Sequence, residues 1–418
     1  MSLPRLLRGL EDVPLDRDGH GRVHGELPAD TDGRALVAEL RRARLRGRGG
    51  GGFPLAIKLK AVRRGRRPAV LVVNGCEGEP LSIKDHLLLT RLPHLVIDGA
   101  LALARAAGAA DIRFALDEGD LVGDDMLNWA LDARPELRGG RIAATVAAVP
   151  SGYVSGQETG LVRWHNEGVA APTSVPPRVT ERGIGRRPTL VSNVETVAHV
   201  ALIARHGAEW FAQLGTAEEP GTALVTLAGA VARPGVYEIA LGTRLGALLD
   251  TAGGAVQEID AYLVGGYAGT WVPAPRAGAL VLCEAGLRAV GARLGSGVIL
   301  ALPTSACPVA EMARVTRWLA SESSGQCGPC VRGLGAIADA FESIAAGGAR
   351  PSVLDDLTRW CRLSRGRGAC AHPDGVAQLV TSALDLFSVD LLDHARHGPC
   401  DACERPPQLT VPAFALRG

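Results

Sequence analysis

The sequence feature that most constrains this chain is a set of three cysteines on two turns that lie far apart in the sequence. Cys327 and Cys330 flank a Gly-Pro pair, and Cys370 follows in a second glycine-containing turn. A Gly-Pro turn lets two thiolates point the same way, and a cuboidal iron–sulfur cluster needs thiolates that converge on one small object. A fourth cysteine is missing, because Ser324 occupies the position three residues before Cys327. The two turns are therefore expected to meet in the folded chain.

The last third of the chain is predicted to be a helical bundle. Apolar residues recur at helical spacing in four segments, namely Val309, Met312, Val315 and Leu319, then Leu334, Ile337, Phe341 and Ile344, then Leu354, Leu357 and Cys361, then Val376, Leu379, Val380, Leu384 and Phe387. Four helices with short loops predict an antiparallel four-helix bundle over residues 301–395. The two cysteine turns then lie at the same end of the bundle.

The remaining chain predicts two further parts and a tail. In residues 1–218, strand-like runs at 69–75 and 143–149 alternate with a helical run at 95–109, which favours an open α/β sheet with its site beyond the carboxyl ends of the strands. Residues 219–300 combine short strands with one helix at 245–251, which is typical of a small α+β module of the grasp type. Residues 396–418 form a tail that contains Cys400 and Cys403 in a Cys-x-x-Cys pair.

A glycine run is the first candidate ligand-binding motif. Gly47 to Gly52 is interrupted only by Arg48, is followed by Phe53, and precedes a helical segment that carries Lys58. Glycines let backbone N–H groups approach an anion, and a helix N-terminus adds positive potential. The run is interpreted either as a phosphate or flavin cradle or as a flexible loop.

Polar residues at strand ends are the second candidate. Asn74, Glu77 and Glu79 follow the strand at 69–75 directly, and residues 151–159 have the same character. Such side chains suit hydrogen bonds to a ribityl chain, a ribose or a carboxamide, or they form an acidic surface turn. Asn193 and Thr196 are interpreted as a helix cap or as phosphate ligands.

Bulk composition limits the partners and the compartment. The formal net charge is +1, so no overall field favours nucleic acid. The sequence shows no export signal and no apolar stretch long enough to span a bilayer, and nine cysteines without export indicate a reducing cytoplasm. Cys283, Cys307 and Cys361 lie in apolar settings and are expected to be inert core residues. The Cys400–Cys403 pair is interpreted as an inert pair, a metal half-site without a following partner, or a redox pair.

In this order the motifs resemble the NADH-binding flavoprotein subunit of respiratory complex I and the flavoprotein subunits of NAD-linked hydrogenases and formate dehydrogenases. The resemblance covers about residues 41–387. It implies a Rossmann-like FMN domain, a β-grasp module of the soluble-ligand-binding type and a helical bundle with one [4Fe-4S] cluster. It also implies hydride transfer from NADH to FMN, followed by transfer of single electrons to the cluster.

The resemblance assigns roles to individual residues. Those implied to contact FMN or the nucleotide are Gly47, Arg48, Gly49, Gly50, Gly52, Phe53, Lys58, Asn74, Glu77, Glu79, Tyr153, Gly156, Glu158, Asn193 and Thr196. Those implied to bind the cluster are Cys327, Cys330 and Cys370, with Ser324 at the position of the fourth cysteine. No catalytic acid or base is implied, because hydride transfer needs none.

Five positions depart from the family pattern. Ser324 replaces a cluster cysteine, Cys76 replaces an aspartate, and Gln157 replaces the first glutamate of a pair. Two positions that are aromatic in the family fall near Ala61 and Arg178 of this chain. Each lost aromatic ring removes about 1–1.5 kcal/mol of stacking from the nucleotide site. Ser324 is expected to ligate iron as an alkoxide. Alternatively, water or a partner fills the fourth ligand position of the cluster, or the site holds a three-iron [3Fe-4S] cluster.

The sequence therefore predicts an FMN and iron–sulfur oxidoreductase that takes electrons from NADH. Its expected acceptor is an iron–sulfur protein, either a ferredoxin or a thioredoxin-fold [2Fe-2S] subunit. Two alternatives stay open: a scaffold or adaptor subunit that has lost nucleotide turnover, and a flavoprotein that exchanges electrons with ferredoxin without NADH.

Overall fold

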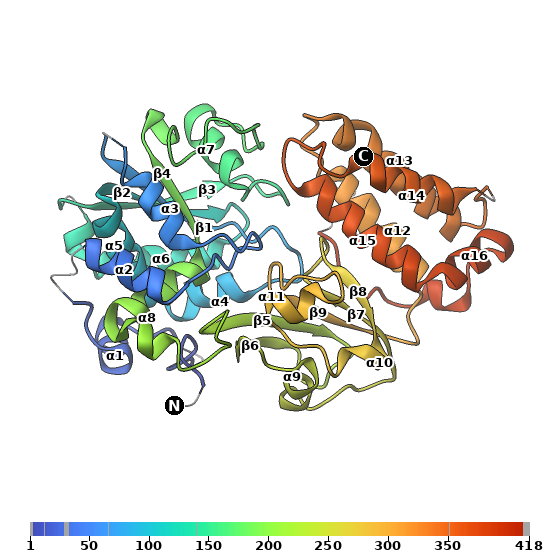
Figure 1. Cartoon of the computed structure of the whole chain (residues 1–418), viewed down its shortest axis with the longest axis horizontal. Helices are drawn as coiled ribbons and strands as arrows, with labels where there is room; N and C mark the ends of the chain where they lie inside the picture. The colour runs from blue at the N-terminus through green and yellow to red at the C-terminus, as the bar shows by residue number, and fades with distance from the viewer. Residues whose placement is uncertain are drawn as a thin grey trace. The chain divides into compact units, whose positions relative to one another are not determined.

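The chain forms two compact units (Figure 1). The computed structural model describes residues 3–11, 13–28, 33–65, 67–138, 140–350 and 352–412. The first unit comprises Met1–Gly78, Ile83–Val225 and Val236–Gly242, and the second comprises Glu79–Ser82, Thr226–Gly235 and Thr243–Gly418. Residues 1, 2, 12, 29–32, 66, 139 and 351 of the predicted parts, and residues 413–418 of the predicted tail, lie outside the described residues.

The first unit is built on a parallel four-stranded sheet of order β3-β2-β1-β4, with β1 at Ala69–Gly75, β2 at Ala109–Asp117, β3 at Ala143–Val149 and β4 at Thr189–Asn193. The strands predicted at 69–75 and 143–149 are confirmed. Along β1, Leu71 and Val73 belong to one buried cluster, whereas Val70 and Val72 belong to another. Successive side chains of a strand point to opposite faces, so both faces of this sheet are covered and its central strand is continuously apolar.

The helices of the first unit are α1 (Arg17–His24), α2 (Gly33–Arg42), α3 (Leu55–Val62), α4 (Lys84–Arg91), α5 (Pro93–Ala107), α6 (Leu121–Asp132), η1 (Pro135–Leu137), α7 (Glu158–Glu167), η2 (Ile184–Arg186) and α8 (Val194–Phe211). Helix α5 covers most of the predicted helical run. It begins at a proline in its first turn and ends at Gly108, whose φ of 70° is left-handed. Helices α5 and α8 pack against each other within the larger core cluster.

A second sheet has the order β6-β5-β9-β7-β8, with β5 at Thr222–Gly229, β6 at Gly235–Ala240, β7 at Ile259–Val264, β8 at Thr270–Pro273 and β9 at Val298–Pro303. Strand β5 pairs with β9 in parallel, whereas β7 is antiparallel to both β8 and β9. Helix α9 spans Leu245–Thr251, as predicted, and the short helices α10 (Ala274–Ala277) and α11 (Glu284–Arg288) follow. The chain is thus a mixed α/β protein with one parallel and one mixed sheet.

The last part of the second unit is helical. Its elements are α12 (Pro308–Ser321), the π-helix η3 (Pro329–Leu334), α13 (Gly335–Ala345), α14 (Val353–Ser364), α15 (His372–Leu386), α16 (Ser388–His397) and the 3₁₀ turn η4 (Asp401–Glu404). The four predicted helical segments correspond to α12, α13, α14 and α15, and their apolar residues are mostly buried. Helix α16 was not predicted, and of its ten residues only Leu391 and His394 are buried.

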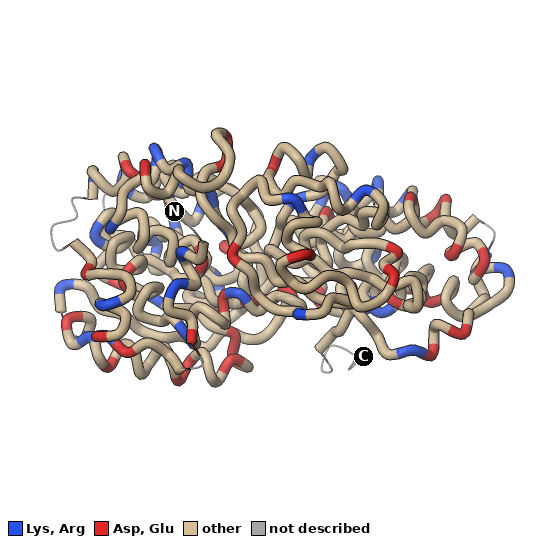
Figure 2. The backbone as a smooth tube through the Cα atoms, turned by 90° about the horizontal axis from the view of Figure 1, so that it is seen from below, with Lys and Arg blue, Asp and Glu red and all other residues tan. Residues whose placement is uncertain are grey.

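Among the described residues, no single helix is long and apolar enough to cross a membrane. Two bent pairs pass the same test of length and composition together, namely α4 with α5 and α15 with α16. Acidic and basic residues are interspersed along the chain in both units (Figure 2).

Candidate cofactor sites

Several predicted site residues of the first unit lie where parallel strands end. Asn74 is near the end of β1, Asn193 ends β4, and Tyr153 and Gly156 follow β3. Because the carboxyl ends of parallel strands share one edge of the sheet, these segments come together there. The glycine run reaches the same place, since a Cβ added at Gly49 would lie 3.1 Å from the Asn193 Cβ.

The glycine run forms a closed loop with open space above it. The Gly47 N–H donates to the Phe53 carbonyl at 3.0 Å, which closes the loop at its base. Gly50 and Gly52 have φ values of 93° and 59°, a region that disfavours side chains. At Gly51, an added Cβ would meet no described atom within 4 Å. Phe53 itself is 43% exposed. The loop therefore fits a bound ligand that approaches its backbone.

The loops after β1 and β3 pack backbone against backbone. The Asn74 side-chain amide donates to the Gly156 carbonyl at 2.8 Å, and its oxygen accepts from the Cys76 N–H. A Cβ at Gly156 would lie 2.8 Å from the Cys76 carbonyl, and one at Gly78 equally close to the Tyr153 carbonyl. Both glycines are thus required by close approach, and Asn74 holds the two loops in register.

Cys76 is an un-ionised thiol. Its Sγ lies 3.6 Å from the Ala115 carbonyl. Burial, and then the nearby charge of Asp117, raise the pKa of Cys76 far above its usual range. This position therefore carries no negative charge at neutral pH, unlike the aspartate that the resemblance implies.

Lys58 and Glu158 form an ion pair across the site. The Lys58 Nζ lies 2.6 Å from the Glu158 carboxylate and donates to the Val191 carbonyl at 3.0 Å. Glu158 is the first residue of α7, and the side-chain oxygen of Gln157 accepts from the N–H groups of Thr159 and Gly160. Gln157 therefore acts as the N-cap of α7, a role that needs an acceptor but not a charge.

Arg48 points into the protein interior. Its guanidinium donates to the Thr222 carbonyl at 2.9 Å and lies 3.8 Å from the Glu195 carboxylate, while its backbone N–H donates to the Thr196 hydroxyl at 2.8 Å. Asn193 caps α8 by accepting from the Glu195 N–H. The helix-cap interpretation of Asn193 is confirmed, and Thr196 ties the glycine loop to the first turn of α8.

A buried ion cluster lies beneath this loop, and we call Lys84, Asp85 and Glu195 the Lys84 cluster. The Lys84 Nζ lies 2.8 Å from Asp85 and 3.1 Å from Glu195, and all three side chains are nearly inaccessible. Asn193 extends the cluster, because its amide donates to the second Asp85 oxygen at 2.6 Å. The cluster therefore joins α4 to α8 directly below the glycine loop.

The pKa values in the Lys84 cluster reflect this crowding. Burial, opposed by Lys84 and supported by Glu77, raises the pKa of Asp85 to about 6. Burial acts to raise the pKa of Glu195, but the Lys84 cation and the His199 side chain, 3.8 Å away, outweigh it and lower that pKa to about 2. Burial likewise acts against the Lys84 cation, yet its two carboxylates raise its pKa above the usual range. Lys84 is thus charged at all physiological pH values.

Two predicted contact residues have protein partners in the structure. The Glu77 carboxylate accepts from the Asp85 and His86 N–H groups and so caps α4. Glu79 belongs to the second unit, where its buried carboxylate accepts from the Tyr267 N–H at 2.9 Å. The nucleotide contact implied for Glu79 stays a prediction.

The three predicted cluster cysteines are brought together in the second unit. The π-helix η3, which carries Cys330, packs against both α14 and α15, and the Cys370 turn joins these two helices. Burial acts to raise the pKa of Cys327, but backbone hydrogen bonds from Ala369 and Cys330 outweigh it and lower that pKa. The Ala369 backbone therefore lies beside the Cys327 thiol, so the two turns meet, as predicted. The two turns thus supply three of the four thiolates that hold a [4Fe-4S] cluster.

Burial raises the pKa of the other two thiols. It raises that of Cys330 to about 11, against a hydrogen bond with the Ser323 side chain, and it raises that of Cys370 above its usual range. The serine that contacts a predicted ligand is therefore Ser323, the neighbour of the predicted Ser324. The spacing of the motif assigns the fourth ligand position to Ser324, and this assignment stays a prediction.

Comparisons with known proteins match both sites. Residues 40–202 match the family described as the Nuo51 FMN-binding domain, residues 310–394 match the NADH-ubiquinone oxidoreductase-F iron–sulfur binding region, and residues 224–264 match the SLBB domain. The chain is similar over 96% of its length to a solved chain of an NAD⁺-reducing [NiFe]-hydrogenase, with a TM-score of 0.86, 32% identity and 68% of that chain covered.

Curated relatives agree with these matches. The chain is 31% identical to the F-type subunit of NADH-quinone oxidoreductase from Streptomyces coelicolor, covering 93% of this chain and 89% of that protein. It is 30% identical to the F-type subunit numbered 2 of the same enzyme from Rhizobium meliloti, covering 96% of this chain and 99% of that protein. This chain belongs to the family of F-type subunits of NADH-quinone oxidoreductase.

Proposed function

We propose that this chain oxidises NADH with FMN bound over the glycine loop and passes electrons through an iron–sulfur cluster held by its cysteine turns. The observation that carries the proposal is the meeting of the Cys327 and Cys370 turns in a chain whose glycine loop stands open at the end of a parallel sheet. When bound, FMN accepts a hydride and gives up single electrons, and the cluster carries them onward. Family membership and the FMN-binding match support this assignment.

In this proposal the chain's own residues bind the flavin and the cluster and orient them. Backbone N–H groups of the glycine loop suit the flavin phosphate, with the N-terminus of α8 and Thr196 beside them. The Asn74 amide and the paired Lys58 and Glu158 suit the polar flavin edge, and the exposed Phe53 ring offers a stacking face. Arg48 and the Lys84 cluster support the loop from below and are positioning residues. Cys327, Cys330 and Cys370, with Ser324 or Ser323, suit the cluster.

The finer architecture is part of the proposal. A Rossmann-like domain over about residues 1–218, a β-grasp module over about 219–300 and an iron–sulfur bundle over about 301–395 agree with the three family matches. The proposed acceptor is an iron–sulfur protein, either a ferredoxin or a thioredoxin-fold [2Fe-2S] subunit. The relatives are themselves named as subunits, which supports a partner of this kind.

An anaerobic visible spectrum before and after addition of NADH tests the function. We expect flavin absorbance near equimolar with the chain, which bleaches on addition of NADH. A colourless protein after reconstitution with FMN and iron would contradict both cofactor assignments. Bleaching with reduced ferredoxin but with neither NADH nor NADPH would instead favour the ferredoxin-linked flavoprotein, an alternative motivated by the lost aromatic residues at Ala61 and Arg178.

Substitution of Gly51 tests the proposed cradle. Gly51→Val adds a side chain where no described atom lies within 4 Å, so the apoprotein should keep its melting temperature. Bound flavin would clash with the new side chain, and overpacking of about 1–3 kcal/mol weakens FMN binding by about tenfold or more. Fluorescence titration of the apoprotein with FMN measures the change. Gly278→Val, at another position with open space, is the matched control. Equal FMN affinity in the two variants would show that the ligand does not lie over Gly51.

A further inference from the structure

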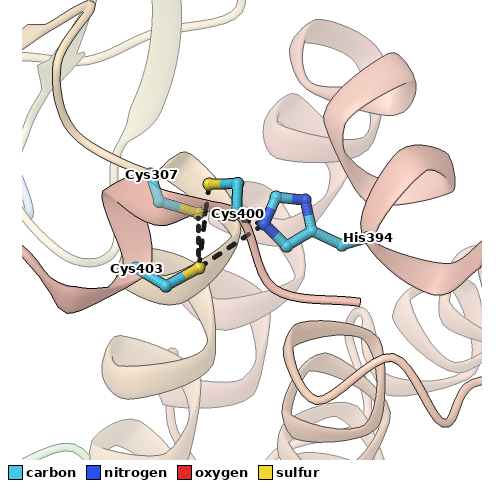
Figure 3. Close-up of side chains that lie close together, drawn as sticks. All are labelled: Cys307, His394, Cys400 and Cys403. Atoms are coloured by element: carbon cyan, nitrogen blue, oxygen red, sulfur yellow. Dashed lines mark hydrogen bonds between the residues drawn. The ribbon is translucent and has the colours of Figure 1, made fainter. Parts of the chain in front are cut away.

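A second set of ligand-type side chains meets in the second unit, apart from the three cysteines already described. The ligand atoms of this C-terminal cluster all lie within 4.8 Å of one another, and Figure 3 shows them pointing toward a common centre; its members are Cys307, His394, Cys400 and Cys403. Cys307 precedes α12, and His394 lies in the last turn of α16. Cys400 directly precedes η4, and Cys403 lies within it. Three separate elements therefore contribute one compact donor set.

The spacing of these atoms is that of one tetrahedral ion. The Cys403 Sγ lies 3.4 Å from the Cys307 Sγ and 3.8 Å from the Cys400 Sγ. The His394 Nε2 lies 3.3 Å from the Cys307 Sγ and 3.5 Å from the Cys403 Sγ. Tetrahedral zinc with ordinary bond lengths separates two sulfurs by about 3.8 Å and a sulfur from a nitrogen by about 3.6 Å.

The orientation of the ligands supports a metal. The Nδ1 of His394 lies 2.9 Å from the Asp390 carbonyl, an acceptor, so Nδ1 carries the proton and donates it there. The Nε2 lone pair then faces the sulfurs, which is the tautomer of a metal-ligating histidine held by a backbone carbonyl. The Cys307 Sγ accepts from the Ala310 N–H at 3.3 Å as the N-cap of α12, which fixes the direction of this thiol.

We propose that the C-terminal cluster binds one zinc ion. Three thiolates and one imidazole form a preferred zinc donor set, and four protein ligands leave no open position for a substrate. The site is therefore structural, and binding releases the protons of the three thiols. The metal half-site interpretation of Cys400 and Cys403 lacked a partner downstream, because the partner ligands come earlier in the chain.

The proposed ion fastens the end of the described chain to α12. Beyond η4, the N–H groups of Gln408 and Leu409 donate to the buried Glu311 carboxylate at 2.8 and 2.9 Å, and the Leu409 side chain is fully buried. Arg405 also donates to the Ser305 carbonyl at 2.8 Å. A metal at the C-terminal cluster would hold the chain at residues 400–403, between the end of α16 and the segment that contains Gln408 and Leu409.

Metal analysis of the full-length protein, together with its cofactor content, tests the proposal. We expect one zinc per chain by inductively coupled plasma mass spectrometry, and three sulfurs with one nitrogen around it by zinc X-ray absorption. Cys403→Ala and His394→Ala should each lower zinc below about a tenth of that value, with faster amide exchange in residues 400–410. FMN and iron content should not change, which separates this site from the proposed electron-transfer function.

Cys283→Ala is the matched control, because Cys283 is a buried thiol outside both cysteine sites. It should retain full zinc. A Cys400–Cys403 disulfide detected by intact mass would overturn the proposal, as would full zinc content in the His394→Ala and Cys403→Ala variants. Iron in place of zinc within this donor set would overturn the assignment to zinc.

Discussion

Lys84→Met is expected to lower the free energy of unfolding by about 3–5 kcal/mol, because it leaves two buried carboxylates without their cation. Lys84 is 2% exposed and contacts Asp85 and Glu195 within 3.1 Å. Methionine fills nearly the same volume, so the loss measures charge rather than packing. Chemical denaturation of the purified protein measures the change. FMN retention should fall as well, since Asn193 and the glycine loop rest on this cluster.

Lys60→Met provides the matched control. Lys60 lies on α3 with an exposed side chain, and removing its charge should change the free energy of unfolding by less than about 0.5 kcal/mol. Equal stability of the two variants would show that the Lys84 cluster contributes no net stabilisation. Glu195→Gln combined with Lys84→Met should recover part of the loss, because one of the two uncompensated charges is then removed.

Cys370→Ala is expected to abolish the iron–sulfur cluster while leaving flavin reduction by NADH intact. Only three cysteines converge at this site among the described residues, so the loss of one leaves too few thiolates to hold a cluster. Electron transfer to a protein acceptor should fall by about tenfold or more, equivalent to at least about 1.4 kcal/mol in activation free energy. Iron analysis and electron paramagnetic resonance measure the cluster, and anaerobic bleaching measures flavin reduction.

Cys361→Ala is the control for that variant, since Cys361 is a buried thiol on α14 outside the two turns. It should retain the cluster. Ser324→Cys should increase four-iron occupancy or shift the reduction potential. Ser323→Ala should lower four-iron occupancy only if the ligand is the serine that contacts Cys330. Unchanged iron content in Cys370→Ala would place the cluster elsewhere.

Much of the fold was predictable because local patterns and tertiary demands agree. Strand β1 reads as a continuous apolar run, since both of its faces are covered, and α12 carries an apolar stripe that is buried along its length. Helix α16 carried no such signal, because the segment Ser388–His397 buries only two residues, Leu391 and His394. A helix that buries so few apolar residues leaves little apolar periodicity in its sequence.

The candidate sites were predictable to different depths. The Cys-Gly-Pro-Cys turn by itself predicts cluster binding, because a tight turn that carries two nearby thiols is typical of a metal or cluster site. The Lys84 cluster carried no signal, although Lys84 and Asp85 are adjacent in the sequence. Their third partner, Glu195, lies more than a hundred residues away, and a buried charge looks like a surface charge in a sequence. His394 was missed as a ligand for the same reason.

By itself the sequence determined which residues can carry chemistry: three cysteines on two turns, a glycine loop and polar residues at strand ends. Local spacing suffices for these, because two thiols on one turn or glycines in one loop need no distant partner. Only the tertiary structure decided which distant groups meet them. It turned Arg48 inward, placed Ser323 against Cys330, and brought Cys307 to His394 across 87 residues of chain. Such contacts depend on how helices pack, and packing is a property of the whole folded unit.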